Sequence, residues 1–233
     1  MEASKPDETY IIDTASGVRL DLDNPRPEDI RIEDVAGGLS KVCRCGAQAR
    51  EYYSVAQHAL LVQRLVVEAG HPELALVALH HDSHEAYLCD IPTPLKLKIR
   101  KATNVYKEAC KTFDRVIAEA FGFEWPEQGS LEQLAIKSAD KQALLIEAAR
   151  LLPDGGEALR QDKGLGEEEY RDLAGLEEPL VPAEAEKRFR RTHEEFTRMA
   201  YVHELLLGTL GLAVQVHALG PCQRRTLEEK ESP

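Results

Sequence analysis

Residues 72–96 read PELALVALHHDSHEAYLCDIPTPLK, and this segment combines a helical apolar pattern with a dense set of polar side chains. Leu74, Val77 and His81 follow one another at spacings of three and four residues, which places all three on one helical face. The prolines near the end of the segment cannot continue a helix. The pattern therefore predicts one helix over 72–88 that carries His81 on an apolar face.

The same periodicity extends over most of the chain on both sides of this segment. It predicts helices near 31–41, 53–69, 72–88, 100–122, 130–152 and 183–207. The stretch over 153–182 is polar and contains glycines and prolines, so it predicts a long loop with at most one short helix. Helices in this number, without the signature of a parallel sheet, predict an all-α fold.

One short β element is expected ahead of the helices. Alternating apolar residues flank a Ser-Gly turn and predict a β-hairpin over 9–22, after which prolines break the chain. We therefore expect a hairpin and linker over 1–27, a helical domain over 28–207 and a C-terminal tail over 208–233.

The overall charge limits the partners. The 233 residues include 29 Lys and Arg against 41 Asp and Glu, a formal net charge of −12. Such a surface repels nucleic acid polymers and anionic membranes, whereas a local pocket can still attract a small phosphate. The start, MEASKPDETY, shows no secretion signal, and the apolar stretch over 205–223 is interrupted by Gly, Pro, Gln and His. We therefore expect a cytoplasmic protein without a nucleic acid or membrane partner.

Polar side chains recur on the apolar faces of the predicted helices. His58 lies between Val55 and Val62 at helical spacing, and Asp140 has Ile136 one turn before it. One such residue alone is usually a hydrogen-bonded core residue. A carboxylate among aliphatic side chains is costly unless it is paired or bound to metal. We therefore expect His58, His81, Asp82 and Asp140 to bind one divalent cation. These donors suit Mn, Co, Zn, Fe and Mg alike.

The order of these residues resembles that of a known enzyme superfamily. The run YSVAQH over 53–58 and the run HDSHEAYLCDIPTPLK over 81–96 are similar to the HD-domain metal-dependent phosphohydrolases. Bacterial 5′-deoxynucleotidases and phage dATP triphosphohydrolases are the members that they resemble most. The resemblance covers roughly residues 28–150, and it implies an HD-domain helical bundle in which the four residues above are the metal ligands.

The resemblance also implies roles for two further carboxylates. Glu85 matches the acidic residue that handles the catalytic water, and Asp90 matches a second acidic residue needed for activity. Together these two side chains could hold a second metal ion. Glu147 lies on the same helical face as Asp140, and we expect it to form a structural ion pair with Arg150.

Substrate contacts are expected from four residues. Arg44 falls where the family has an arginine that contacts phosphate or sugar, and Lys96 matches a lysine just after the Pro-Thr-Pro turn. The family usually has a bulky aromatic residue directly after this arginine, whereas this chain has Cys45, so its base selectivity stays open. His84 is expected to line the same pocket.

These residues predict a divalent-metal-dependent phosphohydrolase whose partner is a small nucleotide. The first expectation is a 5′-deoxynucleotidase that releases phosphate from deoxynucleoside monophosphates. Two alternatives stay open: a triphosphohydrolase that releases triphosphate from dATP or a similar nucleotide, and a non-catalytic module that senses nucleotides. The resemblance also implies a homo-oligomer, a dimer or larger.

Overall fold

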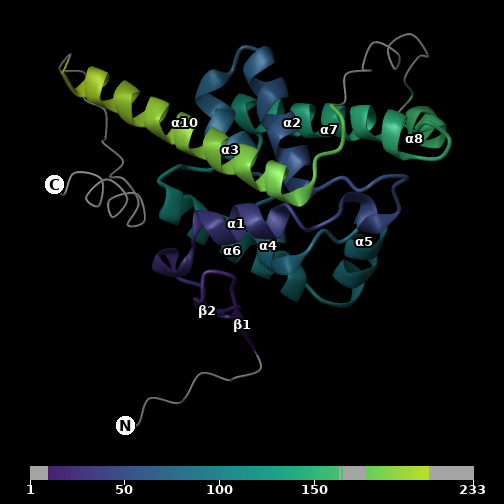
Figure 1. Ribbon diagram of the computed structural model, residues 1–233, viewed down its shortest axis with the longest axis horizontal. Coiled ribbons are helices and arrows are strands. Elements are labelled where there is room, and N and C mark those ends of the chain that lie inside the picture. The colour runs from purple at the N-terminus through teal and green to yellow at the C-terminus, as the bar shows by residue number, and fades with distance from the viewer. Residues whose placement is uncertain (1–9, 163, 165–176, 210–233) are drawn as a thin grey trace.

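A computed structural model describes residues 10–162, 164 and 177–209. The described chain is mostly helical, as predicted, and Figure 1 shows how its elements are arranged. The helices are α1 (Ile32–Leu39), α2 (Val55–Glu68), α3 (Ala75–Leu79), α4 (Glu85–Leu88), α5 (Thr93–Ala102), α6 (Val105–Phe121), α7 (Leu131–Leu151), α8 (Glu157–Asp162) and α10 (Pro182–Thr209).

The predicted N-terminal hairpin is confirmed. Strand β1 (Ile11–Asp13) pairs antiparallel with β2 (Arg19–Asp21). Leu20 on β2 is fully buried, so one face of the hairpin joins the helical core. Asp34 on α1 accepts hydrogen bonds from the backbone N–H and the hydroxyl of Ser16, at 2.8 and 2.6 Å. These bonds hold the hairpin turn against the first helix.

The helix predicted over 72–88 is wrong in one respect, because it is broken in the middle. Residues 80–84 form a turn between α3 and α4, which we call the HD turn. In this turn the His81 Nδ1–H donates to the Ala78 carbonyl at 2.8 Å. Side-chain bonds to nearby backbone compete with the regular helical ladder. His81 therefore lies just past the end of α3 and not within a continuous helix.

The helix predicted over 100–122 is also two helices. Thr103 has an extended backbone, with φ of −159°, and it separates α5 from α6. Pro94 occupies the first turn of α5, where a missing N–H costs nothing. The helix therefore starts earlier than predicted and includes Lys96. Within the loop predicted over 153–182, the described residues contain one short helix, α8.

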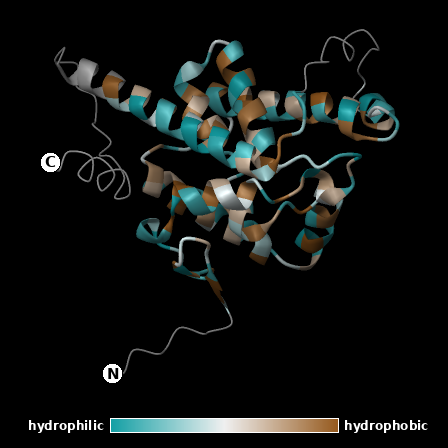
Figure 2. Ribbon diagram, viewed as in Figure 1, coloured by the Kyte–Doolittle hydropathy of each residue, from teal (hydrophilic) through white to brown (hydrophobic). Residues whose placement is uncertain are grey.

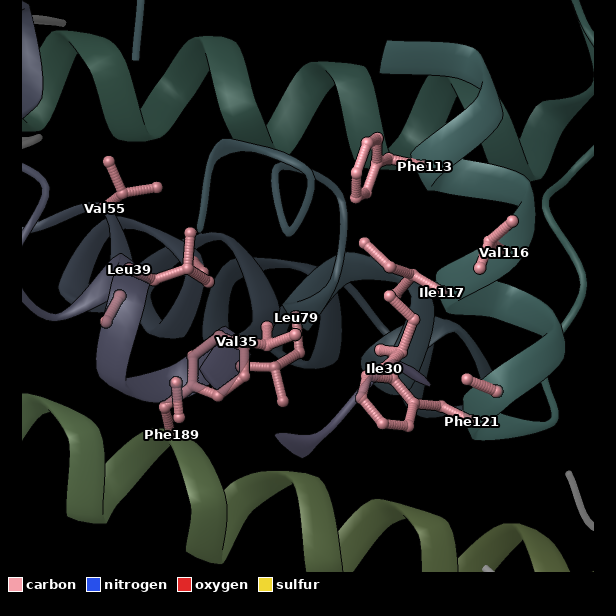
Figure 3. Packing of buried hydrophobic residues seen from close by; sticks show 14 of the residues in the cluster. Ile30, Val35, Leu39, Val55, Leu79, Phe113, Val116, Ile117, Phe121 and Phe189 are labelled. Carbon is pink, nitrogen blue, oxygen red and sulfur yellow. The ribbon is translucent and has the colours of Figure 1, made fainter. Parts of the chain in front are cut away.

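The core has two apolar clusters that share α2. The first joins the hairpin, α1, α2, α3, α6 and α10, and Figure 3 shows its packing; its largest members are Leu20, Ile30, Leu39, Leu79, Phe113, Ile117, Phe121 and Phe189. The second packs α2 against α3 and α7. Figure 2 shows apolar and polar residues alternating along the helices, as expected of elements buried on one side. Because α2 belongs to both clusters, its buried face is held rigidly at the centre.

A pair of neutral histidines completes the core beneath the HD turn. His80 Nε2 and His193 Nδ1 are 2.9 Å apart and share a hydrogen bond, while His80 Nδ1 bonds the Ser83 hydroxyl at 2.8 Å. Burial lowers the pKa of His80 well below its usual value and that of His193 to about 4. Both rings are therefore uncharged at neutral pH, and His80 uses both ring nitrogens inside the core.

The C-terminal region extends only partly into the described structure. Of the tail predicted over 208–233, residues 210–233 lie outside the described residues. In the part of the chain that is described, no helix has the length and apolar character that crossing a bilayer requires.

Gly38→Ala is expected to destabilise the fold by about 1–3 kcal/mol, because it overpacks the contact between α1 and α4. A Cβ atom on Gly38 would lie 2.9 Å from the Ala86 carbonyl oxygen. Gly37→Ala is the matched control, since its Cβ would meet only the flexible ends of Lys41 and Glu186, at 3.4 and 3.6 Å. Urea unfolding should show a stability loss for the first variant alone. Equal losses for both variants would contradict the close helix contact.

Candidate metal centre

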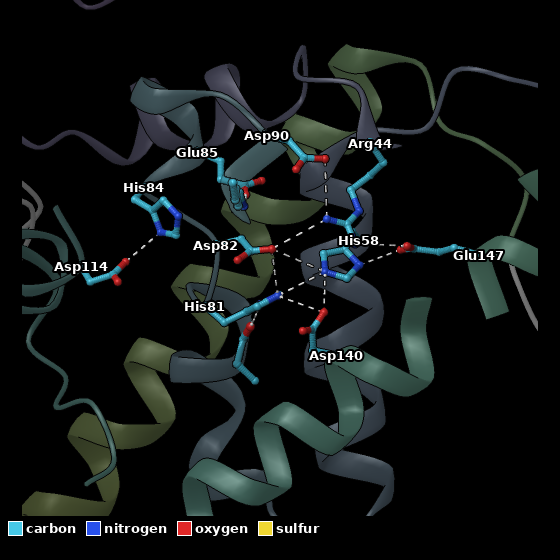
Figure 4. Close-up of polar contacts among 12 residues, drawn as sticks. Arg44, His58, His81, Asp82, His84, Glu85, Asp90, Asp114, Asp140 and Glu147 are labelled. Carbon is cyan, nitrogen blue, oxygen red and sulfur yellow. Dashed lines mark hydrogen bonds and ion pairs between the residues drawn. The ribbon is translucent and has the colours of Figure 1, made fainter. Parts of the chain in front are cut away.

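Three elements bring the predicted metal ligands together at the centre of the molecule (Figure 4). His58 comes from the buried face of α2 and is 0% exposed. His81 and Asp82 come from the HD turn, and Asp140 comes from the middle of α7. The side chain of Asp140 is 46% exposed, so the site opens to solvent on the α7 side.

The donor atoms of these four residues are close neighbours. His58 Nε2 lies 3.2 Å from His81 Nε2, 3.2 Å from Asp140 Oδ1 and 3.7 Å from Asp82 Oδ2. His81 Nε2 lies 3.2 Å from Asp82 Oδ2 and 3.9 Å from Asp140 Oδ1. Ligands that share an ion at about 2.0–2.2 Å are roughly 3 Å apart, so the spacing suits a divalent cation. The donor types also fit, since imidazole nitrogen and carboxylate oxygen are common ligands of such ions.

Both imidazoles are oriented by their other nitrogen atom. His58 Nδ1 and Glu147 Oε1 are 2.7 Å apart, and the His81 Nδ1–H donates to the Ala78 carbonyl. Each hydrogen bond leaves Nε2 facing the centre, which is how proteins commonly fix a metal-binding histidine. The predicted ligands are thus presented by a preformed arrangement.

Opposing charges dominate the titration of the ligands. Burial and the nearby Arg44 disfavour a charged His58, but the carboxylates of Glu147 and Asp140 outweigh them and raise its pKa to about 9. Burial likewise disfavours an ionised Asp82, but His81, His58 and Arg44 outweigh it and hold the pKa of Asp82 well below its usual value. A cation that binds at this site must therefore displace a proton from His58.

Glu147 is the residue whose role the sequence interpretation missed. It is 1% exposed and contacts both His58 and Arg44, whose Nη2 lies 3.4 Å from Glu147 Oε2. The predicted ion pair between Glu147 and Arg150 is wrong, because Arg150 pairs with Glu178 at 3.0 Å. The sequence signal for this role of Glu147 is its position, two helical turns after Asp140 on the same face of the helix.

Arg44 lies at the centre and is held by three carboxylates. Its Nη1 lies 3.9 Å from Asp82 and 3.8 Å from Asp90, in addition to the contact with Glu147. Its Nε atom is buried and has no hydrogen-bond partner among the described residues. The structure therefore places Arg44 between the predicted ligand Asp82 and the carboxylate of Asp90.

A strained turn sets the position of Arg44. The 3-10 turn Arg44–Ala47 contains Cys45, with φ of 57°, and Gly46, with φ of 58°. A Cβ atom on Gly46 would lie 2.7 Å from Pro92 Cγ, so only glycine allows this turn to pack beside the Pro-Thr-Pro segment. Cys45 is half-buried next to Arg44, and burial raises the pKa of its thiol.

Glu85 forms a second polar group next to the metal ligands. It begins α4 and is 1% exposed, and its Oε1 accepts a hydrogen bond from the Lys96 ammonium at 3.0 Å. Its Oε2 is buried without a partner among the described residues. Burial and the charges of Asp82 and Asp90 raise the pKa of Glu85 to about 7, although Lys96 opposes the shift. The carboxylate can therefore gain or lose a proton near neutral pH.

His84 lies beside Glu85 but is engaged elsewhere. Its Nδ1 lies 2.9 Å from Asp114 Oδ1 on α6. Burial disfavours a charged ring, but hydrogen bonds with Asp114 and Cys110 outweigh it and raise the pKa of His84 to about 11. Potential donor atoms of Asp82, His84 and Glu85 lie within 4.8 Å of one another, and this group differs from the predicted second-ion pair of Glu85 and Asp90.

A cavity of about 470 Å³ opens beside the predicted metal ligands His81 and Asp140. Its other walls come from α6, α7 and the loop between them, and they include Trp125, Pro126, Ile136, Lys111, Arg115 and Lys137. The sequence interpretation did not identify these residues as the walls of a pocket. They lie far from the quoted motifs in sequence.

Comparison with known proteins identifies two relatives along most of the chain. The uncharacterized protein YfdR of Escherichia coli is 32% identical over 188 residues, which cover 81% of this chain and 96% of YfdR. An uncharacterized protein of Rhodobacter capsulatus is 33% identical over 201 residues, which cover 84% of this chain and 94% of that protein. No family model matches the sequence.

Proposed function

The chain belongs to the family that includes YfdR of Escherichia coli and its Rhodobacter capsulatus relative, and from its metal centre we propose that it is a divalent-metal-dependent phosphohydrolase acting on deoxynucleotides. The first choice of substrate is a deoxynucleoside 5′-monophosphate, from which the enzyme releases phosphate. This choice rests on the resemblance of residues 53–58 and 81–96 to the 5′-deoxynucleotidases.

The observation that carries the proposal is the convergence of two imidazole nitrogens and two carboxylate oxygens, each within 3.9 Å of His58 Nε2 or His81 Nε2. A structural core would satisfy these groups in pairs. Here both histidines turn their second nitrogen toward the same point, next to an acid with an unpartnered oxygen. When bound, a divalent cation supplies Lewis acidity that lowers the pKa of a water ligand to about 7 and neutralises phosphoryl charge.

Glu85 is the proposed general base. Its unpartnered Oε2 can accept a proton from the attacking water, and a pKa of about 7 suits proton transfer at neutral pH. The Lys96 ammonium on Oε1 holds the carboxylate in place and keeps the pKa from rising further. Water attack forms the new P–O bond while the bond between phosphorus and the nucleoside 5′-oxygen breaks, and the proton that Glu85 takes from the water passes to the leaving oxygen.

Arg44 and Lys96 are the proposed phosphate-binding residues. The buried Arg44 Nε–H, which has no partner among the described residues, is a donor for a phosphoryl oxygen. Asp90 and Glu147 hold the rest of its guanidinium in place. The Lys96 ammonium lies between Glu85 and solvent and can contact substrate and base together.

The proposal predicts that the metal-loaded protein releases inorganic phosphate from deoxynucleoside monophosphates. A panel of deoxy- and ribonucleoside mono-, di- and triphosphates with Mn, Co, Zn and Mg should be assayed for phosphate, pyrophosphate and triphosphate. Release of triphosphate would instead identify the dATP-type triphosphohydrolase. A folded, metal-loaded protein that binds nucleotides without hydrolysing any of them would identify the sensing module and contradict the enzyme.

Asp140→Asn tests the proposed ligand set, since it keeps the shape of the side chain and removes the charge of one ligand. Metal content after dialysis should fall relative to the parent, and activity should fall with it. Unchanged metal content would remove Asp140 from the ligand set.

A further inference from the structure

The cavity beside His81 and Asp140 is continuous with the proposed reaction centre, because two of the metal ligands form part of its wall. A molecule in this cavity therefore touches the ligand side chains directly. Its volume of about 470 Å³ lies within the range of roughly 300–1,000 Å³ that is typical of small-molecule sites. The cavity is large enough for a nucleoside whose phosphate reaches the centre.

The apolar part of the wall has a fixed aromatic surface. The Trp125 indole N–H donates to the Asp114 carbonyl at 2.8 Å, and the Phe123 ring meets the indole edge-on with centroids 5.2 Å apart. These two contacts orient the indole, which is half-buried and lines the cavity together with Ile136. An aromatic face held in advance loses little entropy when a flat ligand stacks on it.

The outer part of the wall is cationic. Lys111, Arg115 and Lys137 all line the cavity and are exposed. Among the described residues, Lys111 and Arg115 form only exposed ion pairs within α6, with Glu108 at 3.2 Å and Glu119 at 3.6 Å. Such pairs are weak and leave the cations able to attract an anion. In a protein of net charge −12, this rim locally attracts an anionic ligand toward the mouth of the cavity, although it does not contact the phosphate once the nucleotide is bound.

The side of the proposed metal site that faces Arg44 is less suited to bind a nucleobase. There the groups are the buried charges of Arg44, Glu85 and Asp90, which form a polar surface that suits a phosphate better than an uncharged ring. A smaller cavity of about 300 Å³ between α5 and α6 contains Lys96 and Tyr106, but none of the four proposed metal ligands lines it.

We propose that the cavity between α6 and α7 binds the sugar and base of the nucleotide, with the Trp125 indole as the stacking surface for the base. This inference rests on the proposed function and assigns the nucleoside half of the same substrate. It places the phosphate toward Arg44 and Lys96, on the far side of the metal ligands.

Trp125 is the single tryptophan of the chain, so tryptophan fluorescence reports on the surroundings of this one residue. The Glu85→Gln variant loaded with Mg²⁺ should be titrated with deoxynucleoside monophosphates. We expect saturable quenching, with the same midpoint as binding measured by calorimetry. Deoxyribose 5-phosphate, which lacks the base, should bind without comparable quenching.

Substitutions locate the base independently. Trp125→Ala, made in the same background, should weaken nucleotide binding by roughly 5- to 100-fold, as expected for loss of one stacked base. It should leave the affinity for deoxyribose 5-phosphate unchanged, and Trp125→Phe should retain most of the nucleotide affinity. Tyr106→Ala is the matched control in the smaller cavity and should bind nucleotides like the parent.

The outcomes separate this inference from the proposed function. If calorimetry detects nucleotide binding but Trp125→Ala binds as tightly as the parent, the base lies elsewhere and the inference is wrong, while the phosphohydrolase proposal stands. Weakening by Tyr106→Ala alone would move the base to the smaller cavity and would also overturn the inference. If neither binding nor hydrolysis of any nucleotide is detected, both proposals fail. Should Trp125→Ala not fold, Trp125→Phe and the quenching titration provide the test.

Discussion

Glu85→Gln is expected to lower kcat for deoxynucleotide hydrolysis by roughly 10²- to 10⁴-fold while the divalent metal stays bound. The amide keeps the shape of the side chain and can still accept the hydrogen bond from Lys96, but it cannot take a proton from water. The buried, unpartnered Oε2 is the position from which that proton transfer is proposed to occur. Phosphate release should be measured together with metal content and thermal stability.

Glu68→Gln is the control for this substitution. Glu68 is an exposed carboxylate on α2 whose ion-pair partner is Arg64, so its variant should match the parent in rate, metal content and stability. If Glu85→Gln hydrolyses nucleotides at the parental rate, the proposed base is wrong. If it loses the metal as well as the activity, Glu85 acts through the metal site and not as the base alone.

Glu147→Ala is expected to cause the largest loss of stability, about 3–5 kcal/mol, because it leaves Arg44 and His58 buried without their shared carboxylate. The same change removes the acceptor that orients His58, so metal affinity should fall by roughly 10- to 100-fold. Urea unfolding of the metal-free protein and metal titration of the folded protein measure the two effects separately. Loss of both would identify Glu147 as a positioning residue of the metal centre.

Glu178→Ala is the matched comparison, because Glu178 is the carboxylate that pairs with Arg150. That pair is exposed, so its loss should leave both stability and metal affinity nearly unchanged. Glu147→Gln adds a finer test, since the amide oxygen can still accept from His58 Nδ1 but carries no charge. Full retention of metal affinity in Glu147→Ala would show that His58 does not need this acceptor.

Much of the architecture follows from local patterns in the sequence. Helical periodicity predicted α1, α2, α7 and α10 within a few residues of where they lie, and alternation around a Ser-Gly turn predicted the hairpin. The helix predicted over 100–122 covered α6 but merged it with the end of α5. The helix predicted over 72–88 failed at residues 80–84, because side-chain bonds such as that of His81 to Ala78 end α3. Periodicity records which face is buried, but it does not reveal such competing bonds.

The candidate site likewise contains some features that the sequence predicted and others that it did not. The positions of His58 and Asp140 among apolar residues required that their polar groups find partners, so their convergence could be predicted without coordinates. The identity of those partners could not. Glu147 was predicted to bind Arg150, three residues away, whereas it binds His58 and Arg44, at sequence separations of 89 and 103 residues.

The amino-acid sequence alone therefore specified the helical bundle, the hairpin and the four residues proposed to bind metal, because each depends on spacing along one element or on the cost of burying charge. The tertiary structure decided how the imidazoles are oriented, where Arg44 is held and which side of the centre carries the Trp125 cavity. These features depend on contacts between elements far apart in the chain, and their geometry is set only when α2, α6 and α7 pack together.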